Sequence, residues 1–245
     1  MESLIKCENL YKNYGGQPAL NDVNLEIGSG RIVGLLGPNG SGKTTLLKIL
    51  CGLLKESSGR AMINRHVPGT RTKSFVSYLP DRPYFPAWAK VSDMLNLFDD
   101  FYADFDRKKS EAMCEALGAR MNQRIKTMSR GTKEKIQLAL VMSRKASIYL
   151  LDEPIAGVDP AARDFILNTI ITNYNEEGTV VISTHLIADI ERILDEAIFL
   201  KDGQIVLHQG VDGIRQDNGK SVDAVFREIF KTVPYLEVAG GENNA

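Results

Sequence analysis

The sequence has few features of a secreted or membrane-spanning protein. Its three cysteines, Cys7, Cys51 and Cys114, are far apart among 245 residues and form no C-x-x-C pair, so neither a disulfide framework nor a zinc knuckle is indicated. No apolar run approaches the roughly 18 residues that span a bilayer. The first ten residues lack the basic start and long apolar stretch of a secretory signal. We therefore expect a reduced, cytoplasmic chain, and any role at a membrane requires another chain to span it.

An excess of charge of one sign is also missing. The 30 Lys and Arg residues nearly balance 31 Asp and Glu residues, so the net charge is −1. A general attraction to nucleic acid or to an anionic membrane is therefore not predicted, and we expect no nucleic-acid partner. Internal repeats and long low-complexity segments are absent too. The length leaves room for one large α/β domain with a sizeable core.

Short apolar segments predict a core rich in β-structure. The opening residues 4–27 hold two partly alternating segments around a glycine pair, which favours antiparallel strands joined by a turn. Another strand is predicted over residues 74–79, and residues 196–210 form a hairpin that turns at Asp202-Gly203. Continuous apolar runs predict strands buried on both faces, as in a parallel sheet, over residues 31–37, 146–154 and 178–185.

Helical patterns occupy much of the remaining chain. Helical spacing covers residues 41–54 and most of residues 92–145, where Gly118 is suited to end a helix. Residues 221–231 carry an apolar face with the i, i+3, i+4, i+7, i+8 spacing of an amphipathic helix. The last residues, 232–245, are predicted to be a short tail that frays.

A glycine-rich stretch carries the first chemical signal. Residues 37–44, GPNGSGKT, satisfy G-x-x-x-x-G-K-[ST] between a predicted strand and a predicted helix. Backbone N–H groups of such a loop wrap around phosphates, and the helix N-terminus adds the positive end of its dipole. Lys43 can then reach the β- and γ-phosphates, and Thr44 can offer its hydroxyl to Mg²⁺. The flanking elements favour nucleotide binding over a glycine turn without a ligand.

Polar residues end two of the predicted buried strands. Asp152 and Glu153 follow the apolar run IYLL, so Asp152 is suited to hold Mg²⁺ and Glu153 to polarise an attacking water. Thr184 and His185 end another strand, and ligands of α/β proteins bind at the carboxyl ends of parallel strands. We therefore expect His185 to contact the γ-phosphate. Taken alone, a strand-end glutamate or a single histidine is more often a surface residue.

These motifs, in this order, resemble the ATP-binding subunit of ABC transporters over about residues 4–231. The resemblance implies an α/β P-loop NTPase core with a mainly parallel sheet, an antiparallel β subdomain and a helical subdomain insertion. One ATPase domain would cover residues 1–231, with the helical subdomain at about 88–145. The activity implied is hydrolysis of ATP with Mg²⁺, and Tyr14 matches the aromatic residue that stacks on adenine, with Tyr11 a weaker candidate. The ATP-binding residues implied within the chain are Tyr14, Gly37, Pro38, Asn39, Gly40, Ser41, Gly42, Lys43, Thr44 and Thr45.

The resemblance also implies catalytic and metal-binding roles. Its catalytic residues are Lys43, Glu153 and His185, and its Mg²⁺ ligands are Thr44, Asp152 and Asp81. Asp81 departs from the family pattern, which usually has glutamine there. It could still reach Mg²⁺ or its water, but with a full negative charge. Acidic residues at this position are similar to those of a branch of bacterial exporter-type cassettes.

The stretch MSRGT at 128–132 is similar to the L-S-G-G-Q signature of the family, which closes on ATP held by the P-loop of another subunit. Ser129 is a favourable helix N-cap, and Gly131 permits close backbone approach. Arg130 replaces the first signature glycine, and Thr132 replaces the glutamine. The arginine either strengthens the clamp or weakens closure. With Asp159 of the D-loop-like AGVDP, the predicted contacts to ATP in trans are Ser129, Arg130 and Gly131.

Prolines and aromatic residues cluster just after Asp81, in RPYFPAW. In the family this region meets the membrane subunit, and rigid aromatic anchors suit an interface. We predict that Tyr84, Phe85 and Trp88 help form that docking surface. The resemblance implies three things about assembly: a separate transmembrane permease subunit, pairing as a homodimer or a heterodimer with a second ATP-binding subunit, and a place at the inner face of the cell membrane.

Other function classes fit less well. A soluble ABC ATPase that is not coupled to transport often has two cassettes or a long coiled coil, and this chain has one P-loop and no such heptad run. A GTPase would need an N-K-x-D motif, which is absent, and a kinase does not need the signature. A regulatory cassette with weakened catalysis stays open through Arg130 and Asp81. We favour a transport-coupled ATPase with export as its direction; the transported substrate stays open.

Overall fold

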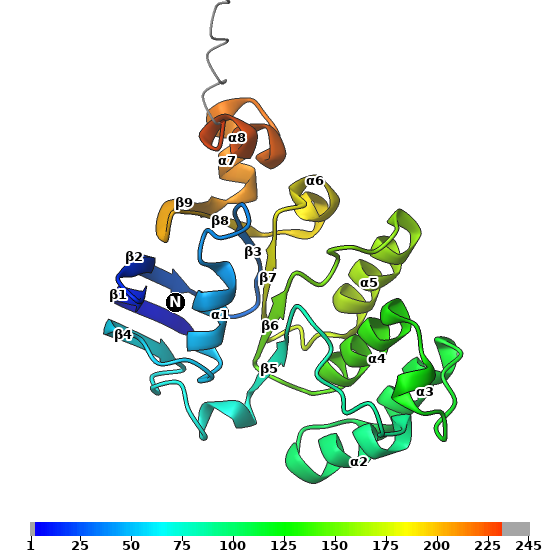
Figure 1. Ribbon diagram of the computed structural model, residues 1–245. Helices are drawn as coiled ribbons and strands as arrows, with labels where there is room; N and C mark the ends of the chain where they lie inside the picture. The colour runs from blue at the N-terminus through cyan, green and yellow to red at the C-terminus, as the bar shows by residue number, and fades with distance from the viewer. Residues whose placement is uncertain (1–2, 232–245) are drawn as a thin grey trace, which may run out of the picture.

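The computed structural model describes residues 3–231, and its strands form two sheets (Figure 1). A six-stranded sheet has the order β5-β6-β7-β3-β8-β9, and a three-stranded sheet has the order β2-β1-β4. The strands are β1 (Ile5–Tyr14), β2 (Gln17–Ile27), β3 (Ile32–Leu36), β4 (Ser58–Ile63), β5 (Val76–Leu79), β6 (Ile148–Asp152), β7 (Thr179–Thr184), β8 (Glu196–Lys201) and β9 (Gln204–Gly210). The α-helices are α1 (Lys43–Leu50), α2 (Val91–Phe101), α3 (Arg107–Ala116), α4 (Arg130–Met142), α5 (Pro160–Asn173), α6 (Ile187–Ile190), α7 (Val211–Asn218) and α8 (Val222–Ile229).

The central strands are mostly apolar because both faces of the larger sheet are covered. Strands β3, β6 and β7 are buried along their whole length, and β5, β6, β7, β3 and β8 pair in parallel. Residues on the two faces of β3 pack into different hydrophobic clusters. Val33 and Leu35 pack toward α1 and the smaller sheet, whereas Ile32 and Leu36 pack toward the opposite face. This confirms the parallel sheet expected from the apolar runs.

The smaller sheet and α1 cover one face of the larger sheet. Strands β1 and β2 pair antiparallel, and β1 also pairs antiparallel with β4, as predicted for residues 4–27. Helix α1 lies beside this sheet in Figure 1. The predicted hairpin at 196–210 is confirmed, since Asp202 and Gly203 have φ values of 47° and 78° between β8 and β9, and both positive values suit a two-residue hairpin turn.

Helices α2, α3 and α4 form a separate lobe with its own hydrophobic cluster (Figure 1). Gly118 ends α3 as predicted: it has φ 71°, its N–H donates to the carbonyl of Glu115, and the next N–H, of Ala119, donates to the carbonyl of Cys114. This pair of bonds satisfies the last free carbonyls of the helix. The lobe falls within the predicted helical subdomain at 88–145. The limits of that subdomain, and of the domain at 1–231, remain predictions.

Arg144 connects this lobe to the edge of the larger sheet. Its side chain is 2% exposed and forms an ion pair with Asp104 at 3.0 Å. The guanidinium also donates to the carbonyls of Lys73, Ser74 and Val76. A buried charge needs such complete pairing, so Arg144 fixes the segment that leads into β5.

The sequence interpretation missed or misplaced several elements. The strand predicted over 74–79 begins two residues later, at Val76, because residues 72–74 form a 3₁₀ turn whose carbonyls bind Arg144. Strand β4 and helices α5, α6 and α7 were not predicted. The predicted tail at 232–245 lies outside the described residues.

Candidate nucleotide-binding site

The loop from residue 37 to residue 42 connects β3 to α1 and depends on two glycines. A Cβ atom on Gly42, where φ is 108°, would lie 2.4 Å from the carbonyl oxygen of Ala19. A Cβ atom on Gly37 would lie 2.4 Å from the carbonyl oxygen of Leu200. Because neither contact is possible for another residue type without backbone movement, these glycines let the loop curl tightly at the start of α1.

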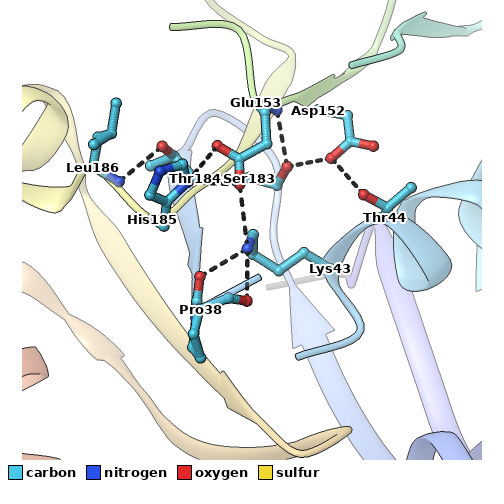
Figure 2. Close-up of polar contacts among 10 residues, drawn as sticks. Pro38, Lys43, Thr44, Asp152, Glu153, Ser183, Thr184, His185 and Leu186 are labelled. Carbon is cyan, nitrogen blue, oxygen red and sulfur yellow. Dashed lines mark hydrogen bonds and ion pairs between the residues drawn. The ribbon is translucent and has the colours of Figure 1, made fainter. Parts of the chain in front are cut away.

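Lys43, the first residue of α1, is held over this loop (Figure 2). Its side chain is 5% exposed, and its ammonium donates to the carbonyls of Gly37 at 2.7 Å and Pro38 at 3.1 Å. It also pairs with the Glu153 carboxylate at 3.2 Å. The loop therefore holds a buried ammonium group, and this group can form a further ion pair with a phosphate group bound there.

Asp152, at the end of β6, is fully buried and holds two hydroxyl groups through one oxygen. Its Oδ1 accepts from Ser183 at 2.6 Å and from Thr44 at 3.1 Å (Figure 2). Its Oδ2 is buried and has no hydrogen-bond partner within residues 3–231. Burial raises the pKa of this carboxyl group, and the two hydroxyl groups oppose that shift. An unpartnered buried carboxylate oxygen beside a threonine hydroxyl is a donor set that suits a hard divalent cation.

Glu153 follows Asp152 in an unusual backbone conformation. Its φ is 49°, which costs a residue with a Cβ about 1–3 kcal/mol and persists where neighbours enforce it. Here its N–H donates to the backbone oxygen and the hydroxyl oxygen of Ser183. The carboxylate then lies between Lys43 and His185, whose Nδ1 is 3.1 Å from Oε2 (Figure 2). The strained turn thus aims Glu153 at the loop.

A cavity of about 250 Å³ lies at the loop, with Lys43, Thr44 and Glu153 in its lining. Five predicted site residues, Gly37, Pro38, Ser41, Asp152 and His185, lie outside that lining. Two unexpected features belong to the region. Ala19 of β2 lines the cavity, and Ser183 fixes both Asp152 and the backbone of Glu153. Asp81 belongs to the lining, and its role as a metal ligand remains a prediction. The full lining comprises Ala19, Asn39, Gly40, Gly42, Lys43, Thr44, Thr45, Asp81 and Glu153.

The structure does not bring every predicted site residue to this cavity. Tyr14, 50% exposed at the end of β1, is not in the lining. Ser129 caps α4 by accepting from the N–H of Thr132 at 3.1 Å, which confirms its predicted capping role. Arg130 pairs with Glu134 at 2.7 Å. Gly131 has open space around a Cβ position, so no contact within residues 3–231 requires glycine there. Asp159, just before α5, also lies outside the lining.

The sequence pattern of the ABC transporter family matches residues 20–156, more than half of the chain. The chain belongs to this family. It is therefore an ATP-binding cassette that hydrolyses ATP. An uncharacterised ABC transporter ATP-binding protein of Methanocaldococcus jannaschii, MJ1023, is 31% identical, over 97% of this chain and 89% of its own.

Two other known proteins are similar to this chain. The lantibiotic transport ATP-binding protein SrtF of Streptococcus pyogenes is 29% identical, over 86% of this chain and 92% of its own. A dimeric structure of the cassette MJ0796, in a post-hydrolysis state with ADP and Pi, matches with a TM-score of 0.75 and 23% identity, over 84% of this chain and 98% of its own. The second likeness shows the fold, which is that of an ABC cassette.

Proposed function

We propose that the cassette drives export by closing head to tail with a second ATP-binding subunit around two ATP molecules. One observation carries this proposal. The cavity at the P-loop has Lys43 and Glu153 in its lining, whereas the signature-like residues 129–131 lie on another lobe and outside that lining. A second subunit can supply those residues in trans. The dimeric structure of MJ0796 supports such pairing.

Within one subunit, the P-loop residues at 37–45 bind the phosphates of ATP. Lys43 contacts the β- and γ-phosphates, and Tyr14 stacks on adenine. Glu153 accepts a proton from the attacking water, since its carboxylate already lies at the loop. His185, 38% exposed beside Glu153, orients the γ-phosphate and the glutamate. From the other subunit, the contacts to ATP come from Ser129, Arg130, Gly131 and Asp159.

Side chains from the end of β6, from α1 and from the segment after β5 fit a Mg²⁺ ion. Asp152 supplies the unpartnered buried oxygen, Thr44 its hydroxyl, and Asp81 a carboxylate in the cavity lining. Mg²⁺ is usually held by one or two carboxylates together with substrate phosphates and water. When bound, the ion neutralises negative charge on the phosphates.

The variant Asp152→Asn is expected to fold but to lose the effect of Mg²⁺ on ATP binding. The asparagine oxygen can still accept from Ser183 and Thr44, while the charge is lost. Wild-type cassette with Mg²⁺-ATP at 100 times its dissociation constant should gain about 2.7 kcal/mol in unfolding free energy. Thermal unfolding with ATP, with and without Mg²⁺, measures this. The matched control Asp164→Asn, at an exposed ion pair, should keep the Mg²⁺ effect; a Mg²⁺ effect that persists in Asp152→Asn contradicts the assignment.

The same substitution also has a pH signature without nucleotide. Burial raises the pKa of Asp152 in the folded chain, so its ionisation opposes folding. The protonated Asp152 carboxyl group contributes to the unfolding free energy at low pH, and this contribution is lost as pH rises through the pKa of the folded chain. Asp152→Asn should remove that loss, which unfolding in urea across pH would show.

The membrane part of the proposal requires a partner. Across residues 3–231, none of the helices has the length and apolar character to cross a membrane. A separate permease would hold the cassette at the inner face of the membrane. Tyr84 and Trp88 are 51% and 73% exposed, and Tyr84 contacts the ring of Phe85. Large exposed aromatics of this kind suit a docking surface. Export as the direction is supported by the likeness to the SkfA peptide export ATP-binding protein SkfE of Bacillus subtilis, which is 30% identical over 83% of this chain and 87% of its own.

Co-purification tests the permease. Tagged wild-type cassette, extracted from its own membranes in mild detergent, should retain a stoichiometric integral membrane protein. The double variant Phe85→Ala/Trp88→Ala should retain at least tenfold less of that membrane protein than wild type, because anchors at an interface centre contribute about 2 kcal/mol or more each. Phe165→Ala, a substitution of an aromatic that is 39% exposed on α5, is the matched control. Undiminished retention by the double variant would show that these aromatics do not dock the permease.

A further inference from the structure

A small cavity lies between the end of β6, the segment after β5 and helix α4. Its volume is about 20 Å³, and one water molecule needs about 10–15 Å³. Asp81 and Glu153 border both this cavity and the cavity at the P-loop. The polar side chains in its lining are those of Asp81, Glu134, Gln137, Asp152 and Glu153.

Two of these side chains carry a buried oxygen atom without a partner. Gln137 on α4 is 1% exposed, and Asp152 at the end of β6 is fully buried. Within residues 3–231, neither Oε1 of Gln137 nor Oδ2 of Asp152 has a hydrogen-bond partner. Buried polar atoms in native proteins are usually satisfied by other protein groups or by ordered water. Because an amide oxygen and a carboxylate oxygen are both acceptors, these two atoms need a donor between them.

The orientation of the Gln137 amide follows from its contact with the segment after β5. Its Nε2 donates to the carbonyl oxygen of Pro80 over 3.5 Å. The opposite orientation of the amide would bring two acceptor oxygens together, so the nitrogen faces Pro80. Oε1 therefore lies on the other side of the amide group, where none of residues 3–231 donates to it.

One water molecule meets the needs of both oxygens. It has two O–H donors, one for Oε1 of Gln137 and one for Oδ2 of Asp152, and the cavity has the volume for it. A carboxylate has about four lone-pair sites, and Oδ1 of Asp152 already accepts from Ser183 and Thr44. A water on Oδ2 therefore leaves one site of this carboxylate for a metal ion.

We propose that Gln137 is a positioning residue that holds the Asp152 carboxylate through one buried water molecule. This inference rests on the Mg²⁺ site proposed above and adds a residue that sets its geometry. Gln137 itself lies outside the lining of the P-loop cavity. Its Oε1 accepts from the water, and its Nε2 holds the carbonyl of Pro80 beside Asp81. Helix α4, which Ser129 caps, is thereby joined to two of the proposed Mg²⁺ ligands.

A high-resolution crystal structure of the full-length wild-type cassette, without nucleotide or Mg²⁺, tests the bridge itself. We expect one ordered water within hydrogen-bond distance of both Oε1 of Gln137 and Oδ2 of Asp152. Direct contact between these two oxygens, or a cavity without an ordered water, would overturn the bridge. This measurement requires no variant and no bound metal.

The variant Gln137→Met tests the positioning role, since methionine has a similar length and no amide group. Thermal unfolding at saturating ATP should require about tenfold more Mg²⁺ for half of the full stabilisation, which is the scale of one hydrogen bond to a charged group. Phosphate release at saturating Mg²⁺ should stay close to wild type, because Gln137 touches no reacting atom. A merely structural role would lower the unfolding temperature without nucleotide and leave the Mg²⁺ requirement unchanged.

The matched control is Gln216→Met, which replaces an exposed glutamine on α7 and should behave as wild type. An unchanged Mg²⁺ requirement in Gln137→Met would overturn the positioning role while the Mg²⁺ site stands. If the stabilisation of wild type by ATP does not depend on Mg²⁺, the Mg²⁺ site itself is wrong, and the role of Gln137 falls with it.

Discussion

Replacing Glu153 with glutamine is expected to leave ATP binding nearly unchanged and to slow hydrolysis by about two to four orders of magnitude, the usual contribution of a general base. The geometry makes this substitution mild for the fold. Glutamine has the same shape, its side-chain oxygen can still accept from Lys43, and the N–H bonds to Ser183 are unaffected. What it loses is the ability to take a proton from water.

Phosphate release measured under saturating Mg²⁺-ATP, together with binding of a fluorescent ATP analogue, separates the two effects. Glu177→Gln, at an exposed position between α5 and β7, is the matched control and should hydrolyse ATP as wild type does. Near-normal hydrolysis by Glu153→Gln would remove Glu153 from the role of base, even if ATP binding is retained.

Lys43→Ala is expected to weaken ATP binding on the order of 100-fold and to abolish measurable hydrolysis at ordinary ATP concentrations. A hydrogen bond to a charged group contributes about 1.5–3 kcal/mol, and each 1.4 kcal/mol is tenfold in affinity. The lysine is suited to contribute this because its ammonium is buried and already held at the loop by the carbonyls of Gly37 and Pro38. Its side chain therefore loses little conformational entropy when ATP binds.

The same helix provides the control. Lys48→Ala removes a lysine from the last turn of α1, and that side chain is not in the lining of the P-loop cavity. ATP titration by calorimetry should therefore show a wild-type dissociation constant for Lys48→Ala. Equal losses in both variants would mean that the positive charge of α1 as a whole, and not the position of Lys43, governs binding.

The site could be predicted from sequence where its parts are local. The loop at 37–44 needs only its own glycines and the strand and helix beside it, and Asp152-Glu153 directly follows a buried strand. Ser183 was missed because its role depends on register. It lies opposite Asp152 only after β6 and β7 pair in parallel, and no local pattern records that pairing.

The missed elements have comparable physical reasons. Strand β4 contains Gly59, and a Cβ atom there would meet the backbone of Asn9. The strand therefore depends on close approach to β1, and its sequence lacks the alternation of apolar and polar residues that predicts a strand. Helix α7 is short and carries Gly213. The late start of β5 depends on Arg144, about 70 residues away.

We propose that ATP joins two cassettes, with residues 129–131 of one closing on the nucleotide of the other. Light scattering of purified Glu153→Gln, with and without Mg²⁺-ATP, tests it most directly, because slow hydrolysis preserves the closed state. We predict a monomer without nucleotide and a dimer with Mg²⁺-ATP, and loss of that dimer in Glu153→Gln/Ser129→Arg, where a large side chain occupies the closing surface. A Glu153→Gln chain that binds Mg²⁺-ATP fully and stays monomeric would contradict closure between two copies of this chain.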